Sequence, residues 1–174
     1  MADMPVIFLV RHGLAEDRST SGRDEDRLLT RDGVEKMQRA AAGLAWLDVK
    51  PDAIWSSPLR RALQTAELVR DAIAPGIELA TEPRLRPEAD VDTMLHGLQA
   101  SSGVQALMLV GHEPTISALA SALLTGSTSG ARMPFKPGSV LAIEFASFPP
   151  AGRGSLRWFM TPEQLRQLSA STQV

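Results

Sequence analysis

The chain has 174 residues, a length that suits one domain with a substantial hydrophobic core, and we expect a single domain over residues 1–174. Its formal net charge of −2 argues against broad binding to nucleic acid, and no apolar run is long enough to span a membrane. Cysteine is absent, which excludes a disulfide framework, a thiolate metal site and a cysteine nucleophile. The segment Met1 to Pro5 lacks the basic and long apolar parts of a signal peptide, so we expect a cytoplasmic protein.

The first predicted element is a strand over Val6 to Val10, five apolar residues that are mostly β-branched. Such a run is typical of a strand that is buried on both faces inside a parallel sheet. The run ends at Arg11, His12 and Gly13, and the glycine allows the chain to turn away closely. In open α/β sheets, ligands bind at the carboxyl ends of the strands, so Arg11 and His12 are candidate functional residues.

Beyond this strand, helices and strands alternate along the chain. A polar loop over residues 14–29 precedes a helix that starts at the capping residue Thr30 and ends near Leu47. Further strands are predicted at 53–55, 77–80, 106–110, 139–145 and 156–160. Further helices are predicted at 59–73, 91–98 and 115–124, with a last one that starts after the capping residue Thr161. This alternation predicts an α/β fold, namely a three-layer α/β/α sandwich with a mainly parallel central sheet.

A second buried strand ends in nearly the same way as the first. The sequence Leu-Val-Arg-His-Gly at 9–13 has a counterpart in Leu-Val-Gly-His at 109–112, so His112 also follows an apolar strand. A single loop histidine is usually an ordinary hydrogen-bonded residue. Two histidines at matching strand ends indicate a shared site.

The strand that ends at Trp55 is followed by Ser56 and Ser57, and then by Arg60 and Arg61 at the start of a helix. A helix N-terminus already attracts anions, and arginine there is unfavourable for the helix itself, so the pair indicates a bound anion. Considered alone, this pair would be better explained as two solvated surface arginines. Together, the three strand ends supply two histidines and at least two arginines around one pocket.

This set of side chains suits phosphoryl transfer, in which catalysis is mostly positioning and charge stabilisation, and a neutral imidazole can act as the nucleophile. A metal site is disfavoured because arginines repel a cation and no carboxylate lies at ligand spacing. A Ser-His-Asp hydrolase is disfavoured because the sequence contains no G-x-S-x-G elbow.

Three stretches resemble the signatures of the histidine phosphatase superfamily, also called the phosphoglycerate mutase-like fold. They are, in chain order, Val10 to Gly13, Ser56 to Ala66 and Val110 to His112. The Arg-His-Gly triplet alone is a weak signal, whereas the three stretches in this order and spacing are a strong one. The small size of the chain, and the stretch from Arg27 to Gly33, resemble the SixA-type phosphohistidine phosphatases.

By this resemblance His12 is the nucleophile, and Arg11, Arg61 and His112 bind the phosphoryl group. Arg27 is implied as a further phosphate ligand. Arg61 matches the family arginine because it directly precedes Ala62, which leaves Arg60 as a solvated surface residue. We also include the hydroxyl of Ser57 among the candidate substrate-binding groups.

The proton donor is where the sequence departs from the family pattern. Many members carry a glutamate in the loop after the third strand, and here Glu88 is the first candidate and Asp90 the second. Either residue could instead cap the helix that starts near Val91, and Asp90 is well placed to do so. A phosphoramidate leaving group needs less help from an acid, because its nitrogen can be protonated before cleavage.

The leading hypothesis is a phosphatase without metal or other cofactor that hydrolyses phosphohistidine on a protein, of the histidine phosphotransfer type, through phospho-His12. A second hypothesis is a phosphatase or mutase of small phosphoesters, although no insertion is long enough for the lid that a mutase needs. A third is a non-catalytic module that binds a phosphorylated partner. In each case we expect the pocket to attract phosphate or sulfate, and we expect no nucleic acid and no membrane as partner.

Overall fold

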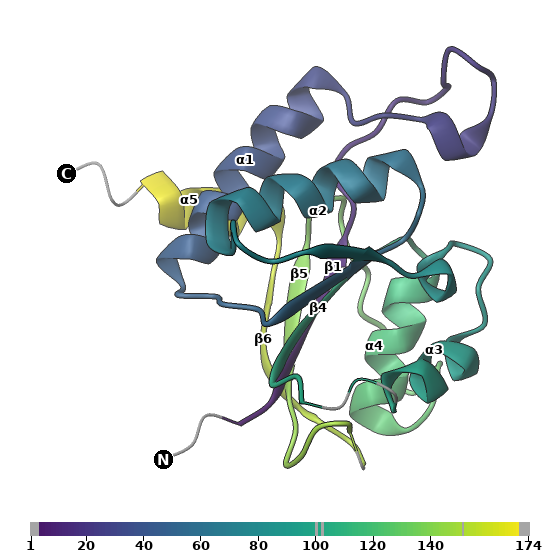
Figure 1. Cartoon of the computed structure of the whole chain (residues 1–174), viewed down its shortest axis with the longest axis vertical. Helices are drawn as coiled ribbons and strands as arrows, with labels where there is room; N and C mark the ends of the chain where they lie inside the picture. The colour runs from purple at the N-terminus through teal and green to yellow at the C-terminus, as the bar shows by residue number, and fades with distance from the viewer. Residues whose placement is uncertain (1–3, 100, 102, 151, 171–174) are drawn as a thin grey trace.

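The computed structural model describes residues 4–99, 101, 103–150 and 152–170, and its centre is a six-stranded sheet (Figure 1). Residues 1–3, which belong to the segment examined for a signal peptide, lie outside the described part. The strands are β1 (Val6–Arg11), β2 (Ala53–Ser56), β3 (Leu79–Thr81), β4 (Ala106–Gly111), β5 (Val140–Glu144) and β6 (Ser155–Met160). The α-helices of the described residues are α1 (Arg31–Trp46), α2 (Arg60–Ile73), α3 (Val91–Leu98), α4 (Thr115–Thr125) and α5 (Pro162–Ala170). Two short 3₁₀ helices, η1 (Asp24–Asp26) and η2 (Pro83–Leu85), lie in loops.

The strand order is β3-β2-β4-β1-β5-β6, so the two most apolar strands are internal. Strands β1, β2, β3 and β4 run parallel to one another, and β5 runs antiparallel to both β1 and β6. The predicted mainly parallel sheet is therefore confirmed. Because β1, β4 and β2 are parallel neighbours, their carboxyl ends meet at one edge of the sheet, where the site is built.

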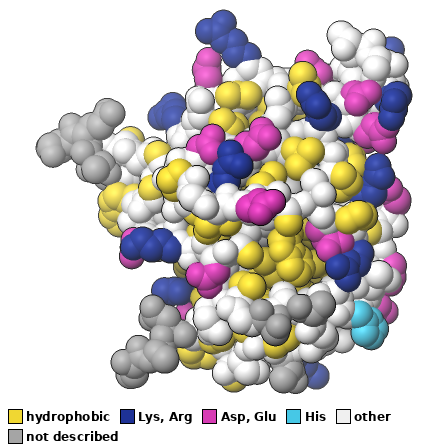
Figure 2. Space-filling view, in the orientation of Figure 1, with side chains coloured by type: hydrophobic (Ala, Val, Ile, Leu, Met, Phe, Trp, Pro, Cys, Tyr) yellow, Lys and Arg dark blue, Asp and Glu magenta, His cyan; other side chains and the backbone are white. Residues whose placement is uncertain are grey.

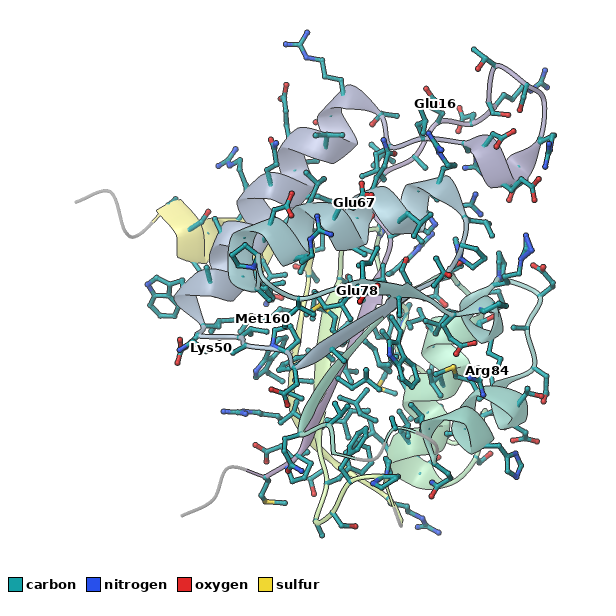
Figure 3. All side chains as sticks on the ribbon, in the orientation of Figure 1. Glu16, Lys50, Glu67, Glu78, Arg84 and Met160 are labelled. Carbon is teal, nitrogen blue, oxygen red and sulfur yellow. The ribbon has the colours of Figure 1, made fainter. Side chains whose placement is uncertain are left out.

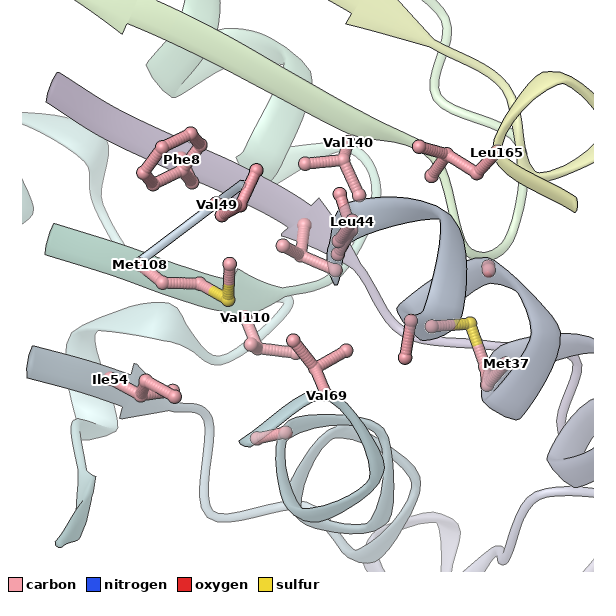
Figure 4. Packing of buried hydrophobic residues seen from close by; sticks show 14 of the residues in the cluster. Phe8, Met37, Leu44, Val49, Ile54, Val69, Met108, Val110, Val140 and Leu165 are labelled. Carbon is pink, nitrogen blue, oxygen red and sulfur yellow. The ribbon is translucent and has the colours of Figure 1, made fainter. Parts of the chain in front are cut away.

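Helices cover both faces of the sheet and bury two separate sets of side chains. Successive strand residues point to opposite faces, so Phe8 and Val10 lie on one face and Ile7 and Leu9 on the other. The first face packs against α1, α2 and α5, as the close view of this cluster shows (Figure 4). The second face packs against α3 and α4. This arrangement confirms the predicted three-layer α/β/α sandwich.

Two predicted helix caps are present in the structure. The side chain of Thr30 accepts a hydrogen bond from the backbone N–H of Gly33 at 2.9 Å, which starts α1. At the start of α5, the backbone N–H of Thr161 donates to Oε1 of Gln164, and the backbone N–H of Gln164 donates to Oγ1 of Thr161. These contacts complete the capping box that the sequence predicts.

The structure corrects some predicted boundaries. The third strand was expected at 77–80 but spans Leu79–Thr81, because the N–H of Ile77 donates to the carbonyl of Ala74 and keeps that residue in a turn. The loop over 14–29 contains η1, and an antiparallel bridge between Ala15 and Leu29 joins its two ends.

In the described residues, no helix is long and apolar enough to cross a bilayer. Acidic and basic side chains are interspersed over the visible face (Figure 2), which fits the small net charge.

Candidate active site

The site lies where β1, β4 and β2 end side by side. The N–H of His12 donates to the carbonyl of Gly111, and the N–H of Ser57 donates to the carbonyl of Val110, so the three chain segments continue in register past the strands. The rings of His12 and His112 face each other with centroids 4.9 Å apart and planes tilted by 56°. The expected convergence of the two histidines at one end of the sheet is therefore observed.

The imidazole of His12 is held in one orientation. Its Nδ1 lies 2.7 Å from the carbonyl oxygen of Gly13, an acceptor, so Nδ1 carries the proton and Nε2 keeps its lone pair. Burial lowers the pKa of His12 to about 4, and the positive charges of Arg61 and Arg11 act in the same direction against the opposing hydrogen bond to Gly13. The ring is therefore neutral at pH 7, as a nucleophile must be.

Helix α2 holds the backbone that orients His12. The N–H of Gly13 donates to Oγ1 of Thr65 at 3.0 Å, and the Thr65 hydroxyl donates to the carbonyl of Arg61 at 2.7 Å. A Cβ on Gly13 would lie 2.5 Å from Cγ of Met37, so any larger residue here would have to displace that buried side chain of α1. Thr65 thus connects the residue that orients His12 to the turn of helix that carries Arg61.

His112 is oriented by Ser57. Its Nε2 lies 2.8 Å from Oγ of Ser57, and both side chains are buried. Burial, with the neighbouring His12 and the positive charge of Arg61 acting in the same direction, lowers the pKa of His112 to about 3, so this ring is also neutral at pH 7. The structure places the hydroxyl of Ser57 against His112, where it orients the ring, and the expected contact of Ser57 with substrate stays a prediction.

Three arginines surround the two histidines. The guanidinium of Arg11 donates from Nη1 to the carbonyl of Phe135 at 2.5 Å, and Arg61 is only 4% exposed. Arg27 donates from Nε to the carbonyl of Glu16, a residue that Figure 3 labels on the loop before η1. All three charges lower the pKa of His12, so each acts on the site. Arg60 is exposed, as expected of a solvated residue.

Two buried polar atoms of the site have no hydrogen-bond partner among the described residues, namely Nε of Arg11 and Nδ1 of His112. Buried donors are nearly always paired in folded proteins, so such atoms require an explanation. Since one belongs to a cation and the other to an imidazole beside three guanidinium groups, an anion is the ligand that fits them.

The structure also brings residues to the site that the sequence did not single out. Asp24 accepts hydrogen bonds from both Arg27 and Arg61. Glu113 accepts from the N–H of Phe135 at 2.8 Å, and so fixes the carbonyl that binds Arg11. A signal for both was available, since Asp24 lies one helical turn before Arg27 and Glu113 directly follows His112.

The two candidate proton donors lie in different surroundings. Asp90 caps α3, because its Oδ2 accepts hydrogen bonds from the backbone N–H and the hydroxyl of Thr93, each at 2.9 Å. The second candidate is therefore a helix cap. The side chain of Glu88 is 71% exposed and forms an ion pair with Arg86 at 3.4 Å. Burial lowers the pKa of Arg61, and the charge of Glu88 weakly opposes that lowering. Glu88 thus lies at the rim of the site and within electrostatic reach of its arginines.

The sequence model of the histidine phosphatase superfamily (branch 1) matches residues 7–94, which carry His12, Arg27 and Arg61. The chain belongs to this superfamily. An uncharacterized protein of Picosynechococcus sp. is 34% identical over 128 residues, which are 70% of this chain and 74% of that protein.

Among solved structures, the protein histidine phosphatase SixA in complex with tungstate has a TM-score of 0.82 at 27% identity, over 92% of this chain and 99% of SixA. The alpha-ribazole phosphatase of Shigella flexneri shares the fold, with a TM-score of 0.70 at 20% identity over 90% of this chain and 96% of that one. This protein is therefore a SixA-like phosphatase of the superfamily.

Proposed function

We propose that this phosphatase hydrolyses phosphohistidine on a protein, and that Nε2 of His12 receives the phosphoryl group. The proposal depends chiefly on one observation, the hydrogen bond from Nδ1 of His12 to the carbonyl of Gly13, which leaves Nε2 unprotonated among three arginines. The overall likeness to SixA over nearly the whole of both chains supports a protein substrate.

In the first step, the lone pair of His12 Nε2 attacks phosphorus, and the bond from phosphorus to the imidazole nitrogen of the substrate breaks. The departing nitrogen takes up a proton and leaves as neutral imidazole. Arg11 and Arg61 neutralise the equatorial oxygens as charge shifts in the transition state, and His112 donates a hydrogen bond to the same group. In the second step, water attacks phospho-His12, phosphate leaves, and Nε2 regains its lone pair.

The exposed position of Glu88 suits this substrate class. An alkoxide leaving group needs an acid held against its oxygen, whereas the nitrogen of phosphohistidine can take a proton before the bond breaks. Glu88 at the solvent-facing rim can supply such a proton without a fixed geometry. A site built in this way favours phosphoramidates over phosphomonoesters.

A phosphatase of small phosphoesters is the second candidate, because the alpha-ribazole phosphatase of Shigella flexneri has the same fold. The match to SixA is the better of the two, with a TM-score of 0.82 against 0.70 and an identity of 27% against 20%, which supports the protein substrate. The site also contains every group of the predicted set, His12, Arg11, Arg61 and His112, which disfavours a module that only binds phosphorylated partners.

The deciding experiment compares kcat/KM for a phosphorylated histidine phosphotransfer protein with kcat/KM for a panel of small phosphomonoesters, with His12→Ala as the inactive control. We expect the phosphohistidine protein to be the better substrate by about 10² or more, since only it presents the labile P–N bond and a protein surface. A higher kcat/KM for any small ester would reassign the substrate class.

A further inference from the structure

Asp24 of η1 occupies the hydrogen-bonding groups of two site arginines. Its carboxylate accepts from Nη2 of Arg61 at 3.0 Å and from Nη1 of Arg27 at 2.8 Å. Its backbone carbonyl accepts from Nη1 of Arg61 at 2.9 Å. Both terminal nitrogens of Arg61 therefore donate to one residue, in the forked arrangement with which a guanidinium also grips the oxygens of a phosphoryl group.

The charge of Asp24 acts on groups inside the pocket as well as on the two arginines. It raises the pKa of His112, against the burial and the positive charges that lower it. A phosphoryl group in contact with Arg61 and both histidines would place its oxygens next to this carboxylate. Two anions that share the same guanidinium groups repel each other, so the carboxylate and the phosphoryl group compete for them.

Of these partners, Asp24 is the one that can move. Arg61 is 4% exposed and anchored in α2, whereas the side chain of Asp24 is 60% exposed. The helix η1 contains no buried residue, and its N-cap has no side-chain hydrogen bond. A rotation of Asp24 toward solvent would therefore expose no apolar surface, and a displacement of Arg61 would disrupt the packing of α2.

We propose that Asp24 is an internal competitor of phosphate, which holds Arg61 and Arg27 in alternation with the phosphoryl group and promotes release of the phosphate product. A phosphoryl dianion displaces Asp24 because it also contacts Arg11 and the two histidines, groups that Asp24 does not bond. Weaker anions have too few contacts to displace it. Asp24 thus sets which anions enter the site and how strongly the product is retained. This inference rests on phosphate as product and not on the identity of the substrate.

The test compares Asp24→Asn with Asp26→Asn, a matched control in the same 3₁₀ helix. The carboxylate of Asp26 accepts from Ser21 and pairs with Arg23, and neither residue belongs to the site. The dissociation constant of inorganic phosphate is measured by titration calorimetry, and the inhibition constant of phosphate is measured in the phosphatase assay. We expect Asp24→Asn to bind phosphate roughly tenfold more tightly, because one charge next to the anion is removed. Asp26→Asn should bind phosphate as the wild type does.

Weaker or unchanged phosphate binding in Asp24→Asn would overturn the proposal. If kcat also fell, Asp24 would instead be a residue that positions Arg61. Asp24→Ser, measured beside Asp24→Asn, shows whether the effect depends on lost charge or on the remaining amide, and thermal unfolding confirms that each variant is folded. Because phosphate binding needs no phosphorylated protein, a wild type that ignores phosphohistidine while Asp24→Asn tightens phosphate would disprove only the substrate assignment.

Discussion

At His12, one hydrogen bond decides which ring nitrogen can react. The carbonyl of Gly13 requires the proton to sit on Nδ1, so the reactive lone pair lies on Nε2. The same burial that lowers the pKa of the ring to about 4 keeps this nitrogen unprotonated at physiological pH. Orientation and protonation state are thus set by the backbone and by burial, without a carboxylate partner for the ring.

The residue His12 carries the first prediction. The substitution His12→Ala should lower turnover by a factor on the order of 10⁴ or more, because no other group offers a positioned lone pair. The variant should stay folded, since His12 lies beyond the end of β1. Circular dichroism and turnover measurements check both points. The trapped phosphoenzyme of the wild type should be labile to acid and stable to base, as a phosphoramidate is, and a base-labile adduct would point to another nucleophile.

A second prediction concerns the proton donor. The substitution Glu88→Gln should slow the hydrolysis of phosphomonoesters roughly tenfold and that of phosphohistidine only slightly, because general acid catalysis matters most for a poor leaving group. The expected effect is below the ~10²–10⁴ of a firmly positioned acid because the side chain of Glu88 is exposed. For each substrate, the kcat/KM of Glu88→Gln is divided by the kcat/KM of the wild type, and the two quotients are compared. Asp90→Asn is the control. An equal, small effect on both substrates would remove Glu88 from the mechanism.

At the scale of elements, helix α2 positions two parts of the site at once. Arg61 extends from its first turn, and Thr65 lies one turn later and bonds both the carbonyl of Arg61 and the N–H of Gly13. A shift of α2 would move Arg61, a proposed phosphate ligand, and change the orientation of His12 at the same time. Through this coupling, the motif from Ser56 to Ala66 and the Arg-His-Gly triplet form one site.

The prediction for this element is that Thr65→Val lowers kcat roughly tenfold with little change in KM, because His12 loses its precise orientation while the arginines remain. Thr65→Ser keeps the hydroxyl and should restore most of the activity. Steady-state kinetics and urea unfolding of the three proteins separate this effect from a loss of stability. If Thr65→Ser is as impaired as Thr65→Val, the threonine methyl group and not the hydrogen bond is what matters.

The elements that the sequence predicted well are those that local pattern determines. The strand of Val6 to Val10 follows from an unbroken apolar run, and the starts of α1 and α5 follow from capping residues. The histidines were found because polar residues at the ends of apolar strands contrast with what precedes them, and Arg61 was chosen over Arg60 because Ser56 to Ala66 resembles a family motif. These features depend on neighbours in the chain, so one sequence is enough to read them.

The contacts that the sequence did not predict join residues far apart in the chain. Asp24 meets Arg61 across 37 positions, and Glu113 meets Phe135 across 22. Such pairs depend on how loops fold over the sheet, and a loop of polar residues has many conformations of similar energy. For the same reason the hydrogen bond between Ser57 and His112, which are 55 positions apart, was not predicted, although both residues were expected in the site.

At the scale of the whole molecule, the site makes folding depend on pH. His12 and His112 have pKa values of about 4 and about 3 in the folded protein, both below the ordinary value of 6.5. Below pH 6.5 the two histidines therefore bind protons in the unfolded chain but not in the folded protein. The free energy of unfolding then falls as the pH falls from about 6.5 toward these lowered values.

The last prediction follows from this fall in the free energy of unfolding at lower pH. Between pH 7 and pH 5 the free energy of unfolding should drop by roughly 2 kcal/mol for His12 alone, as expected for a histidine with a pKa lowered to about 4. Asp24 affects the free energy of unfolding in a separate pH range, because its lowered pKa matters only below the ordinary value of 3.8. Urea titrations at pH 7 and pH 5 measure the drop, which should shrink in His12→Ala and persist in the control His96→Ala, whose side chain is exposed on α3. A drop of the same size in His12→Ala would mean that His12 is not held neutral in the fold, and that the nucleophile needs another means of losing its proton.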